Sequence, residues 1–412
     1  MEVIIHKGTN QIGGCITEIR TNKTRIIIDF GEDLPSEEET NIKPLIIKGL
    51  NDNKESLYNA VFITHSHGDH IGKINEINKD IDVYVEEYTK LIHNLTCEFT
   101  RKETITRPTK NIKFGETIII NNDIKVTPYI VDHSSYNSCM YLIEADNKKV
   151  VHTGDYRNHG KKGIVFEDNI KKIGKIDALI TEGTTLSREV DKYETEDSLY
   201  KKAIDIFNSY DDILILQSST NIDRLVSFYK AALKTNKNFV EDLFSATIAS
   251  NISKTIPSPI SNHPNVSVWI PYKYRNKPQD FKEKYTKPME QYRNNSAFHK
   301  NVCMMVKQSM LEDIKFLKDE KHKFKNACLI YSMWEGYLDD EDMNKFKEEI
   351  ENMNIKFIKL HTSGHADVSA MEFVRDNLKP DKVITIHTKA KENAKNIFDN
   401  CINANDNEII IV

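Results

Sequence analysis

The sequence predicts an α/β protein, and two observations carry this prediction. Short apolar runs bounded by turn residues follow one another through the first third of the 412-residue chain, which is the pattern of β-strands. From about residue 211 the pattern changes to longer units, in which a strand-like run precedes apolar residues at helical spacing. Strands therefore dominate the beginning of the chain, and strand–helix units follow.

The elements are predicted in chain order as follows. Strands are expected at residues 3–6, 25–28, 61–64, 83–84, 117–120, 140–144, 149–152 and 213–217. A helix at 221–233 comes next, and a strand at 327–331 precedes a helix that carries Met343, Phe346, Ile350 and Met353. After a strand at 356–360, Asp367 opens a last helix with Val368, Met371, Val374 and Leu378 on one face. Pro380 stops that helix before a strand at 382–386.

Composition excludes several classes of protein. The formal charge of −5, from 57 Lys plus Arg and 62 Asp plus Glu, belongs to neither a polycation nor an acidic tail. The chain starts without a leader-like apolar segment and contains no apolar run near the roughly 18 residues of a membrane span. The six cysteines are scattered without a C-x-x-C pair, so we expect reduced thiols in a cytoplasmic protein with no membrane partner.

The strongest functional signal is the segment Thr64-His65-Ser66-His67-Gly68-Asp69-His70, which follows a predicted strand. Three imidazoles and a carboxylate within six residues are suitable zinc ligands. Gly68 is expected to let the backbone turn so that alternate side chains aim at two different ions. The alternative is a polar loop whose histidines bond to each other and to solvent. It is disfavoured because 14 histidines spread over 412 residues rarely place three in six.

This H-x-H-x-D-H segment resembles the metal-binding motif of the metallo-β-lactamase superfamily. Asp29, at the end of a predicted strand, resembles the first motif of that family, an aspartate that supports the metal site through its ligands. His133 in Val-Asp-His-Ser resembles the third motif, and Asp155 in Thr-Gly-Asp resembles the fourth. The resemblance implies an αββα sandwich and two zinc ions, with manganese as the alternative metal. It assigns one ion to His65, His67 and His133, the second to Asp69 and His70, and a bridging position to Asp155.

Three later motifs resemble those of the β-CASP branch, the nucleic-acid-processing enzymes that include ribonuclease J and the mRNA 3′-end endonucleases. Glu182 resembles motif A, His365 in Thr-Ser-Gly-His-Ala resembles motif B, and His387 resembles motif C and would bind the second zinc ion. Residues 217–224 resemble the start of the inserted β-CASP domain. Each motif alone has a simpler interpretation, as a solvated cap, a helix cap or a core histidine. Their occurrence in the family's order favours the family.

The order of the motifs also predicts the domains. Candidate site residues run from Asp29 to Glu182 and return only at His365 and His387, so the middle of the chain must be an insertion. We expect residues 1–185 and 359–412 to form the metallo-β-lactamase domain and residues 186–358 to form an α/β cap. Little sequence follows His387. A counterpart of the C-terminal extension of ribonuclease J is therefore not expected, and a homodimer and a processing complex both stay open.

The resemblance implies a zinc-dependent ribonuclease in which a hydroxide bridging two metal ions attacks phosphorus. Asp69 would orient this nucleophile, Glu182 would belong to the catalytic set, and His365 would either contact the phosphate or protonate the leaving oxygen. Substrate contacts are expected from Ser363, His365, Asn221 and Arg224. Single-stranded RNA is favoured over DNA, because motif C is a histidine in the RNA-processing members. A second candidate for RNA contact is the basic and aromatic segment at 272–287, whose alternative is a solvated face.

Two other functions stay open from the sequence. A hydrolase of small thioesters or lactams is disfavoured because it needs no long insertion between motifs A and B. A non-catalytic RNA-binding paralogue is disfavoured because the ligand motifs are intact. The sequence does not distinguish an exonuclease from an endonuclease.

Overall fold

The chain divides into two compact units in the computed structural model, which describes residues 1–34, 45–188, 193–261, 263–293, 301–321 and 323–412. The first unit consists of residues 1–193 and 364–412, and the second consists of residues 194–363. The domain boundaries predicted from the sequence are at 185/186 and 358/359. By the division in the structure, Ser363 ends the second unit and His365 belongs to the first.

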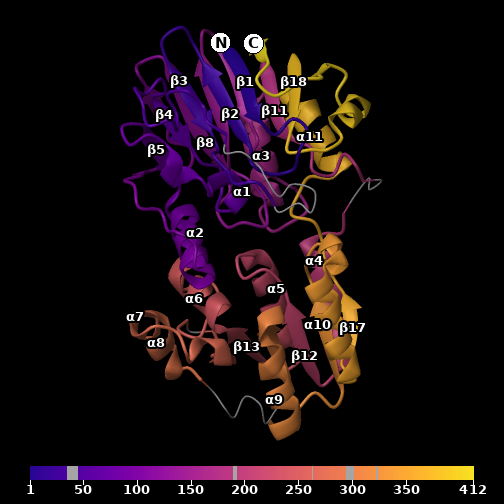
Figure 1. Cartoon of the computed structure of the whole chain (residues 1–412). Coiled ribbons are helices and arrows are strands. Elements are labelled where there is room, and N and C mark those ends of the chain that lie inside the picture. Colours follow the sequence, from indigo (N-terminus) through magenta and orange to yellow (C-terminus); the bar gives the residue numbers. More distant parts are fainter. Residues whose placement is uncertain (35–44, 189–192, 262, 294–300, 322) are drawn as a thin grey trace. The chain divides into compact units, whose positions relative to one another are not determined.

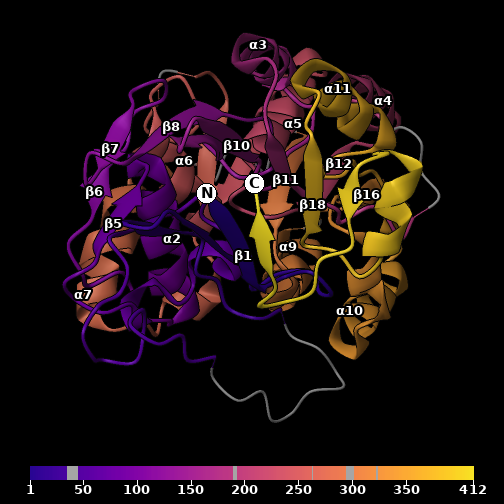
Figure 2. The same ribbon diagram turned by 90° about the horizontal axis from the view of Figure 1, so that it is seen from above.

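One sheet of the first unit contains both chain termini, in neighbouring strands at one of its edges. Its strands, in spatial order, are β20 (Ile409–Ile411), β1 (Glu2–Lys7), β2 (Ile16–Arg20), β3 (Arg25–Ile28), β4 (Ala60–Phe62), β5 (Asp82–Val85) and β6 (Lys110–Asn111). Strand β20 pairs antiparallel with β1, so the two termini lie side by side (Figures 1 and 2). The strands from β3 to β6 run parallel.

The other sheet of the first unit has the order β19 (Cys401–Ile402), β18 (Lys382–Ile386), β11 (Ala178–Glu182), β10 (Lys148–His152), β9 (Cys139–Ala145), β8 (Ile124–Ile130) and β7 (Ile118–Ile120). Apolar residues of both sheets, such as Ile26, Phe62, Tyr141 and Ile180, form one buried core. The two sheets therefore pack face to face as a sandwich.

Helices cover the outer faces of this sandwich. Those of the first unit are α1 (Gly68–Ile71), α2 (Glu87–Thr100), α3 (Gly163–Ile173) and α11 (Val368–Leu378), with the 3-10 turns η1 (Ile74–Glu76) and η7 (Lys391–Asn396). Phe166 of α3 and Met371 of α11 share a core with the second sheet, and the two helices lie side by side in Figure 2. Ile71 of α1 and Ile74 of η1 pack on the first sheet. The predicted αββα sandwich is confirmed.

The second unit is a separate α/β structure around a parallel sheet. Its strand order is β14 (Val266–Trp269), β13 (Asn238–Asp242), β15 (Val302–Val306), β12 (Asp212–Leu216), β16 (Ala327–Tyr331) and β17 (Lys356–Lys359). Its helices are α4 (Glu196–Ser209), α5 (Ile222–Lys234), α6 (Leu243–Ile252), α7 (Gln279–Phe281), α8 (Lys287–Glu290), α9 (Leu311–Lys321) and α10 (Glu341–Asn352). Shorter turns are η2 (Tyr272–Tyr274), η3 (Lys282–Thr286), η5 (Gln308–Met310) and η6 (Glu335–Asp339). Phe207 and Phe228 pack on one side of the sheet, and Leu317 and Phe346 pack on the other.

The predicted elements agree with the structure most closely where apolar runs are uninterrupted. The strands predicted at 25–28, 327–331 and 382–386 have the same bounds as β3, β16 and β18. Strand β2 was not predicted, because Thr17 and Glu18 interrupt its apolar pattern. Glu18 is buried there, and its carboxylate accepts a hydrogen bond from Tyr58 at 2.8 Å.

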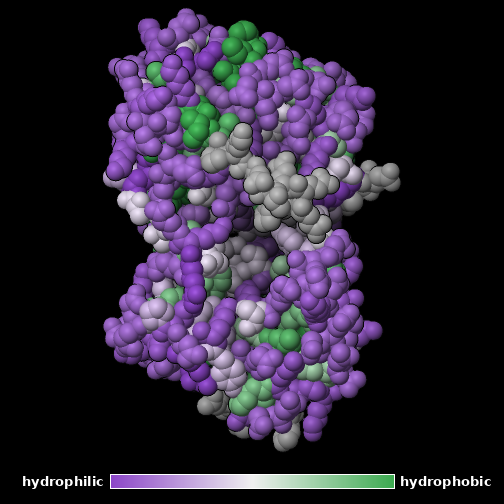
Figure 3. Space-filling view, viewed as in Figure 1, coloured by the Kyte–Doolittle hydropathy of each residue, from purple (hydrophilic) through white to green (hydrophobic). Residues whose placement is uncertain are grey.

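The face viewed in Figure 3 is mostly hydrophilic, with apolar residues gathered in small patches. All six cysteines are free thiols, and five of them are buried. Among the described residues, none of the helices has the length and apolar character needed to cross a bilayer.

Candidate metal centre

Each candidate ligand lies just past the carboxyl end of a strand of the sandwich. The segment from His65 to His70 follows β4, and the other candidate residues follow or end five further strands: Asp29 after β3, His133 after β8, Asp155 after β10, Glu182 at the end of β11, and His387 after β18. These strand ends bring together residues that are up to 358 positions apart, from Asp29 to His387.

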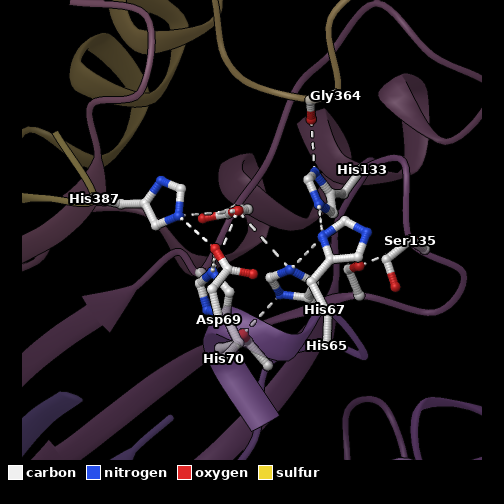
Figure 4. A network of polar contacts seen from close by, with 12 residues as sticks. His65, His67, Asp69, His70, His133, Ser135, Gly364 and His387 are labelled. Carbon is white, nitrogen blue, oxygen red and sulfur yellow. Dashed lines mark hydrogen bonds and ion pairs between the residues drawn. The ribbon is translucent and has the colours of Figure 1, made fainter. Parts of the chain in front are cut away.

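Three histidines form the first cluster (Figure 4). Nε2 of His65 lies 3.0 Å from Nδ1 of His67, and Nε2 of His133 lies 3.3 Å from the same nitrogen. One nitrogen of each ring therefore points at a common position, which a single cation can occupy.

Two carboxylates and two histidines form the second cluster. Nε2 of His387 lies 3.1 Å from Oδ2 of Asp69, and Nε2 of His70 lies 3.4 Å from Oδ2 of Asp155. The same Asp155 oxygen lies 3.9 Å from Nε2 of His65 in the first cluster. Asp155 is thus the carboxylate that lies between the two clusters.

Hydrogen bonds on the far side of the rings fix which nitrogen faces the site. Thr64 donates its hydroxyl to Oδ2 of Asp29 at 2.8 Å, and this hydroxyl also lies 3.0 Å from Nδ1 of His65. A hydroxyl has one proton to donate, so Nδ1 of His65 must be the donor of the second bond. Its Nε2 is then unprotonated and faces the cluster, as a metal ligand requires.

Three other rings are held in the same way. Nδ1 of His70 lies 2.7 Å from Oδ2 of Asp29, and Nδ1 of His133 donates to the carbonyl oxygen of Gly364 at 2.6 Å. Nδ1 of His387 lies 2.7 Å from the Thr184 hydroxyl. In all three the Nε2 atom is turned toward the clusters, so the ring orientation is set before any ion binds.

Buried polar atoms without partners indicate that a cation belongs here. Nε2 of His70 and Oδ1 of Asp155 are buried and have no hydrogen-bond partner among the described residues. Such atoms are rare in folded proteins because leaving them unpaired is costly. Both belong to ligand types that bind divalent ions, so the residues present fit a metal.

The pKa shifts follow from the same burial and charges. Burial lowers the pKa of His65 and His133 well below the usual value, which favours the neutral form that binds metal. Burial also disfavours the charged form of His70, but Asp155, Asp69 and Asp29 raise its pKa well above the usual value. Without a cation, the proton on His70 offsets the negative charge of the carboxylates.

Glu182 and His365 form a pair beside the clusters. Nδ1 of His365 lies 3.1 Å from Oε2 of Glu182 and 3.6 Å from Oδ2 of Asp155. Glu182 also accepts the backbone N–H of Tyr156 at 2.9 Å. Burial lowers the pKa of His365, but Glu182 more than offsets this effect and the pKa rises to about 9. His365 therefore carries a positive charge near neutral pH in the metal-free protein.

Backbone geometry explains several residue choices. Asp29 and His387 have positive φ angles of 64° and 54°, a conformation in which Asp and His are enriched among the residues other than Gly. A Cβ on Gly31 would lie 1.7 Å from the carbonyl oxygen of Asp69, so this glycine allows the metal-binding loop to pack against the strand end. The role expected for Gly68 differs in the structure. Gly68 does not adopt a positive φ, and a Cβ there would instead meet Glu32 at 2.4 Å.

The substrate contacts expected in the second unit have structural partners there. Arg224 is fully buried, and its guanidinium donates to Glu196 at 2.8 Å and to the carbonyl oxygen of Thr362 at 3.1 Å. Asn221 caps α5 by accepting the Arg224 backbone N–H at 3.1 Å. Ser363 is also buried. These contacts give Asn221 and Arg224 a role in holding the second unit together.

The basic and aromatic segment at 272–287 also packs differently from the expectation. Tyr274 and Tyr285 are buried, so their ring faces are not available as stacking platforms. Lys273 donates to the Ser309 hydroxyl at 2.8 Å, and the Arg275 guanidinium lies 3.9 Å over the Tyr272 ring. Lys273 and Arg275 are thus engaged by neighbours inside the same unit.

Sequence reasoning did not identify Thr184 or the backbone of Gly364 as parts of the site. Thr184 contacts His387 through its side chain, and Gly364 contacts His133 through its carbonyl group. A threonine after motif A and a glycine before motif B were visible in the sequence. Their contacts were not predictable, because they join segments about 200 residues apart in the chain.

Comparisons with known proteins agree with this fold. Residues 24–201 match the model of a family described as the beta-lactamase superfamily domain. An RNase J-like protein of Methanocaldococcus jannaschii is 24% identical over 411 residues, which cover 93% of this chain and 91% of that protein. Ribonuclease J of Mycoplasma genitalium is 23% identical over 420 residues, which cover 96% of this chain and 69% of that protein.

A solved structure shares the whole architecture. The crystal structure of a protein of unknown function from Enterococcus faecalis V583 matches with a TM-score of 0.81 at 20% sequence identity, over 100% of this chain and 99% of that one. This likeness shows the fold alone. The sandwich and its strand-end histidines and aspartates define a metallo-β-lactamase-fold protein with a site for divalent metal. Over residues 24–201 the chain is similar to the beta-lactamase superfamily domain, and over most of its length it is similar to proteins named RNase J-like protein and ribonuclease J, which supports a ribonuclease J-like protein of the β-CASP branch.

Proposed function

We propose that this chain is a zinc-dependent ribonuclease that hydrolyses phosphodiester bonds in single-stranded RNA. The observation that carries the proposal is the pair of adjoining clusters, bridged by Asp155 and flanked by the charged pair of Glu182 and His365. The similarity to proteins named ribonuclease J supports RNA as the substrate class. We also propose a cytoplasmic location for this activity.

The two clusters suit two cations. His65, His67 and His133 would hold the first, and Asp69, His70 and His387 would hold the second, with Asp155 between them. Donor sets of nitrogen and oxygen without thiolate suit zinc, and manganese is the alternative. When bound, two such ions would supply an activated water nucleophile near neutral pH and stabilise charge on the phosphate.

The protein side chains would then position the reactants. Asp69 would accept a hydrogen bond from the attacking water, since its carboxylate faces the second cluster. With Nδ1 of His365 held by Glu182, Nε2 is the nitrogen that would meet the substrate. A positively charged His365 suits both a contact to a non-bridging oxygen and donation of a proton to the leaving oxygen.

The choice of RNA rests on two further points. Motif C is a histidine in this chain, as in the RNA-processing β-CASP proteins that it resembles, and His387 completes the second cluster. The net charge of −5 does not oppose RNA binding, because backbone binding needs only a local basic surface. A homodimer and a larger processing complex are both compatible with the proposal.

Two variants separate the ligand role from the catalytic role. We expect His67→Ala to lose bound zinc and RNA cleavage together, because Nδ1 of His67 faces the other two nitrogens of its cluster. We expect His365→Ala to keep its zinc and to lose turnover by roughly 10²-fold or more. Zinc content by elemental analysis and single-turnover cleavage are the measurements. Loss of zinc from the His365 variant would overturn its role as a non-ligand.

The substrate experiment uses zinc-loaded protein with 5′-monophosphorylated linear RNA, circular single-stranded RNA and matched DNA. Mononucleotides from linear RNA alone would indicate an exonuclease, and cleavage of the circle would show endonuclease capacity. A His65→Ala variant controls for contaminating nuclease. Bound zinc without cleavage of any RNA would contradict the proposal, and hydrolysis of a thioester by the same preparation would favour a small-substrate hydrolase.

A further inference from the structure

A group of aromatic and basic side chains lies on the loops that carry two of the metal-site residues. Tyr136 follows His133 by three positions, and Lys162 follows Asp155 by seven. The Lys162 ammonium lies 5.1 Å from the centre of the Tyr136 ring. The ring of Tyr88, in the first turn of α2, meets Tyr136 at right angles, with the ring centres 5.6 Å apart. All three side chains belong to the first unit.

The loop that carries Tyr136 is anchored on both sides of the ring. The Ser135 hydroxyl lies 2.9 Å from the hydroxyl of Ser66, inside the metal-binding motif. The Asn137 side chain donates to Oε1 of Glu86 at 3.1 Å, and Glu86 also caps α2. The position of Tyr136 is therefore fixed relative to the metal site by one neighbour and relative to Tyr88 by the other.

These side chains are accessible from solvent. Tyr88, Tyr136 and Lys162 are all partly exposed, and neither tyrosine belongs to the apolar cores of the unit. Lys161 adds a second, exposed positive charge next to Lys162. An aromatic pair beside two lysines is the combination that binds single-stranded nucleic acid, because bases stack on rings and ammonium groups pair with phosphates.

We propose that Tyr136, Tyr88 and Lys162 form a nucleotide-binding subsite next to the metal centre. One base of the RNA stacks on the Tyr136 ring, which Tyr88 meets at right angles, and Lys162 exchanges its contact with the ring for the phosphate of that nucleotide. Stacking does not distinguish the bases, so the subsite positions the chain without reading its sequence. This inference rests on the proposed ribonuclease function and adds a substrate contact to it.

The test removes the ring from the protein and the base from the RNA, separately and together. Affinity is measured in the His365→Ala background with single-stranded RNAs that carry one abasic nucleotide, stepped along the strand. We expect Tyr136→Leu to weaken binding of intact RNA by about tenfold. At one position, the abasic RNA should bind about tenfold more weakly than intact RNA, and Tyr136→Leu should cause little further loss there. Additive losses at every position would overturn the stacking contact.

Matched variants separate a contact from a structural effect. Tyr136→Phe keeps the ring and should bind RNA like the parent. Lys162→Ala should lower the slope of log affinity against log salt by about one. Lys172, which lies 5.7 Å over Tyr129 in the same unit, provides a second lysine–tyrosine pair as the control, and Lys172→Ala should leave the slope unchanged.

The outcomes distinguish this subsite from the function on which it rests. If the parent protein binds and cleaves RNA while Tyr136→Leu and Lys162→Ala match it in affinity and salt dependence, the subsite is wrong and the ribonuclease stands. If the parent protein neither binds nor cleaves RNA, both proposals fail. Should Tyr136→Leu melt at a lower temperature, Lys162→Ala and Tyr136→Phe still decide the matter, because neither removes a buried group.

Discussion

A single carboxylate organises much of the candidate metal site. Asp29 accepts the backbone N–H of Thr64 at 2.7 Å and the Thr64 hydroxyl at 2.8 Å, and one of its oxygens lies 2.7 Å from Nδ1 of His70. Through Thr64 it also orients His65. Asp29 has a positive φ of 64°, and it contacts the ligand His70 directly and the ligand His65 through Thr64.

We expect Asp29→Ala to weaken zinc binding by about 10- to 100-fold, because loss of such an outer carboxylate frees the ring it orients. A titration against a competing chelator measures this change. Asp177→Ala is the control, because Asp177 pairs at the surface with Lys148, the first residue of β10. Equal zinc affinity of the Asp29 variant and the parent would contradict the role given to Asp29.

The charged pair of Glu182 and His365 predicts a pH dependence of the metal-free protein. Burial lowers the pKa of His365, but Glu182 most strongly, with Asp155 and Asp69, raises it to about 9, above the value of about 6.5 for an unfolded histidine. The folded state therefore binds the proton more tightly. This contribution to stability is complete below about pH 6.5 and is lost as the pH rises through about 9.

Thermal melts of the metal-free protein between pH 6 and 10 test this prediction. The melting temperature of the parent should fall across that window. The melting temperature of the Glu182→Gln protein should be lower at pH 6 and should fall less up to pH 10, because the neutral amide no longer raises the pKa of His365. A fall of the same size in both proteins would show that the pair does not control this part of the pH dependence.

At the scale of elements, one buried ion pair joins several parts of the second unit. Arg224 of α5 donates to Glu196 of α4, to the Ser332 hydroxyl after β16, and to the carbonyl oxygen of Thr362. Two helices and two strand-end loops thus depend on one guanidinium. Its planar fork reaches several acceptors at once, which a lysine ammonium does less well.

We expect Arg224→Ala to destabilise the second unit by about 3–5 kcal/mol, because it leaves Glu196 buried without its partner. Lys202→Ala, which breaks an exposed pair between Lys202 of α4 and Glu194, just before that helix, should cost less than about 1 kcal/mol. Chemical denaturation measures both values. An Arg224→Ala protein as stable as the parent, with weaker RNA binding, would instead support the phosphate contact expected from the sequence.

The sequence predicted elements well when the pattern of apolar residues was local. It predicted the strand–helix units near the end of the chain because each has an unbroken apolar run and a clear stop, such as Pro380 after α11. It did not predict β2, whose buried Glu18 depends on partners from other strands. Tyr274 and Tyr285 were expected at the surface, and only their tertiary packing shows that they are buried.

At the scale of the whole molecule, the metal site is assembled from the two ends of one unit. Six of the proposed ligands come from residues 65–155. The seventh, His387, comes from residues 364–412, which belong to the same unit. The motifs and their order could be read from the sequence. The proton positions on the rings could not, because they depend on contacts such as Gly364 with His133 and Thr184 with His387.

This assembly predicts that removal of metal affects the two units differently. Any ion that binds only the folded state adds stability, about 2.7 kcal/mol when its free concentration is 100 times its dissociation constant. Here all proposed ligands lie in the first unit. We expect chelation to speed hydrogen exchange in residues 1–193 and 364–412, most strongly after β4 and β18. Those strand ends carry proposed ligands, and without an ion the carboxylates repel one another and the imidazoles lose a partner.

Exchange in residues 194–363 should stay the same, since all of the proposed ligands belong to the first unit. Mass spectrometry of peptides from both units, with and without chelator, provides the measurement. The His67→Ala protein is the control and should show fast exchange in the first unit under both conditions. Equal acceleration in both units would mean that the ion stabilises the whole chain, and acceleration confined to residues 194–363 would place the metal outside the proposed site.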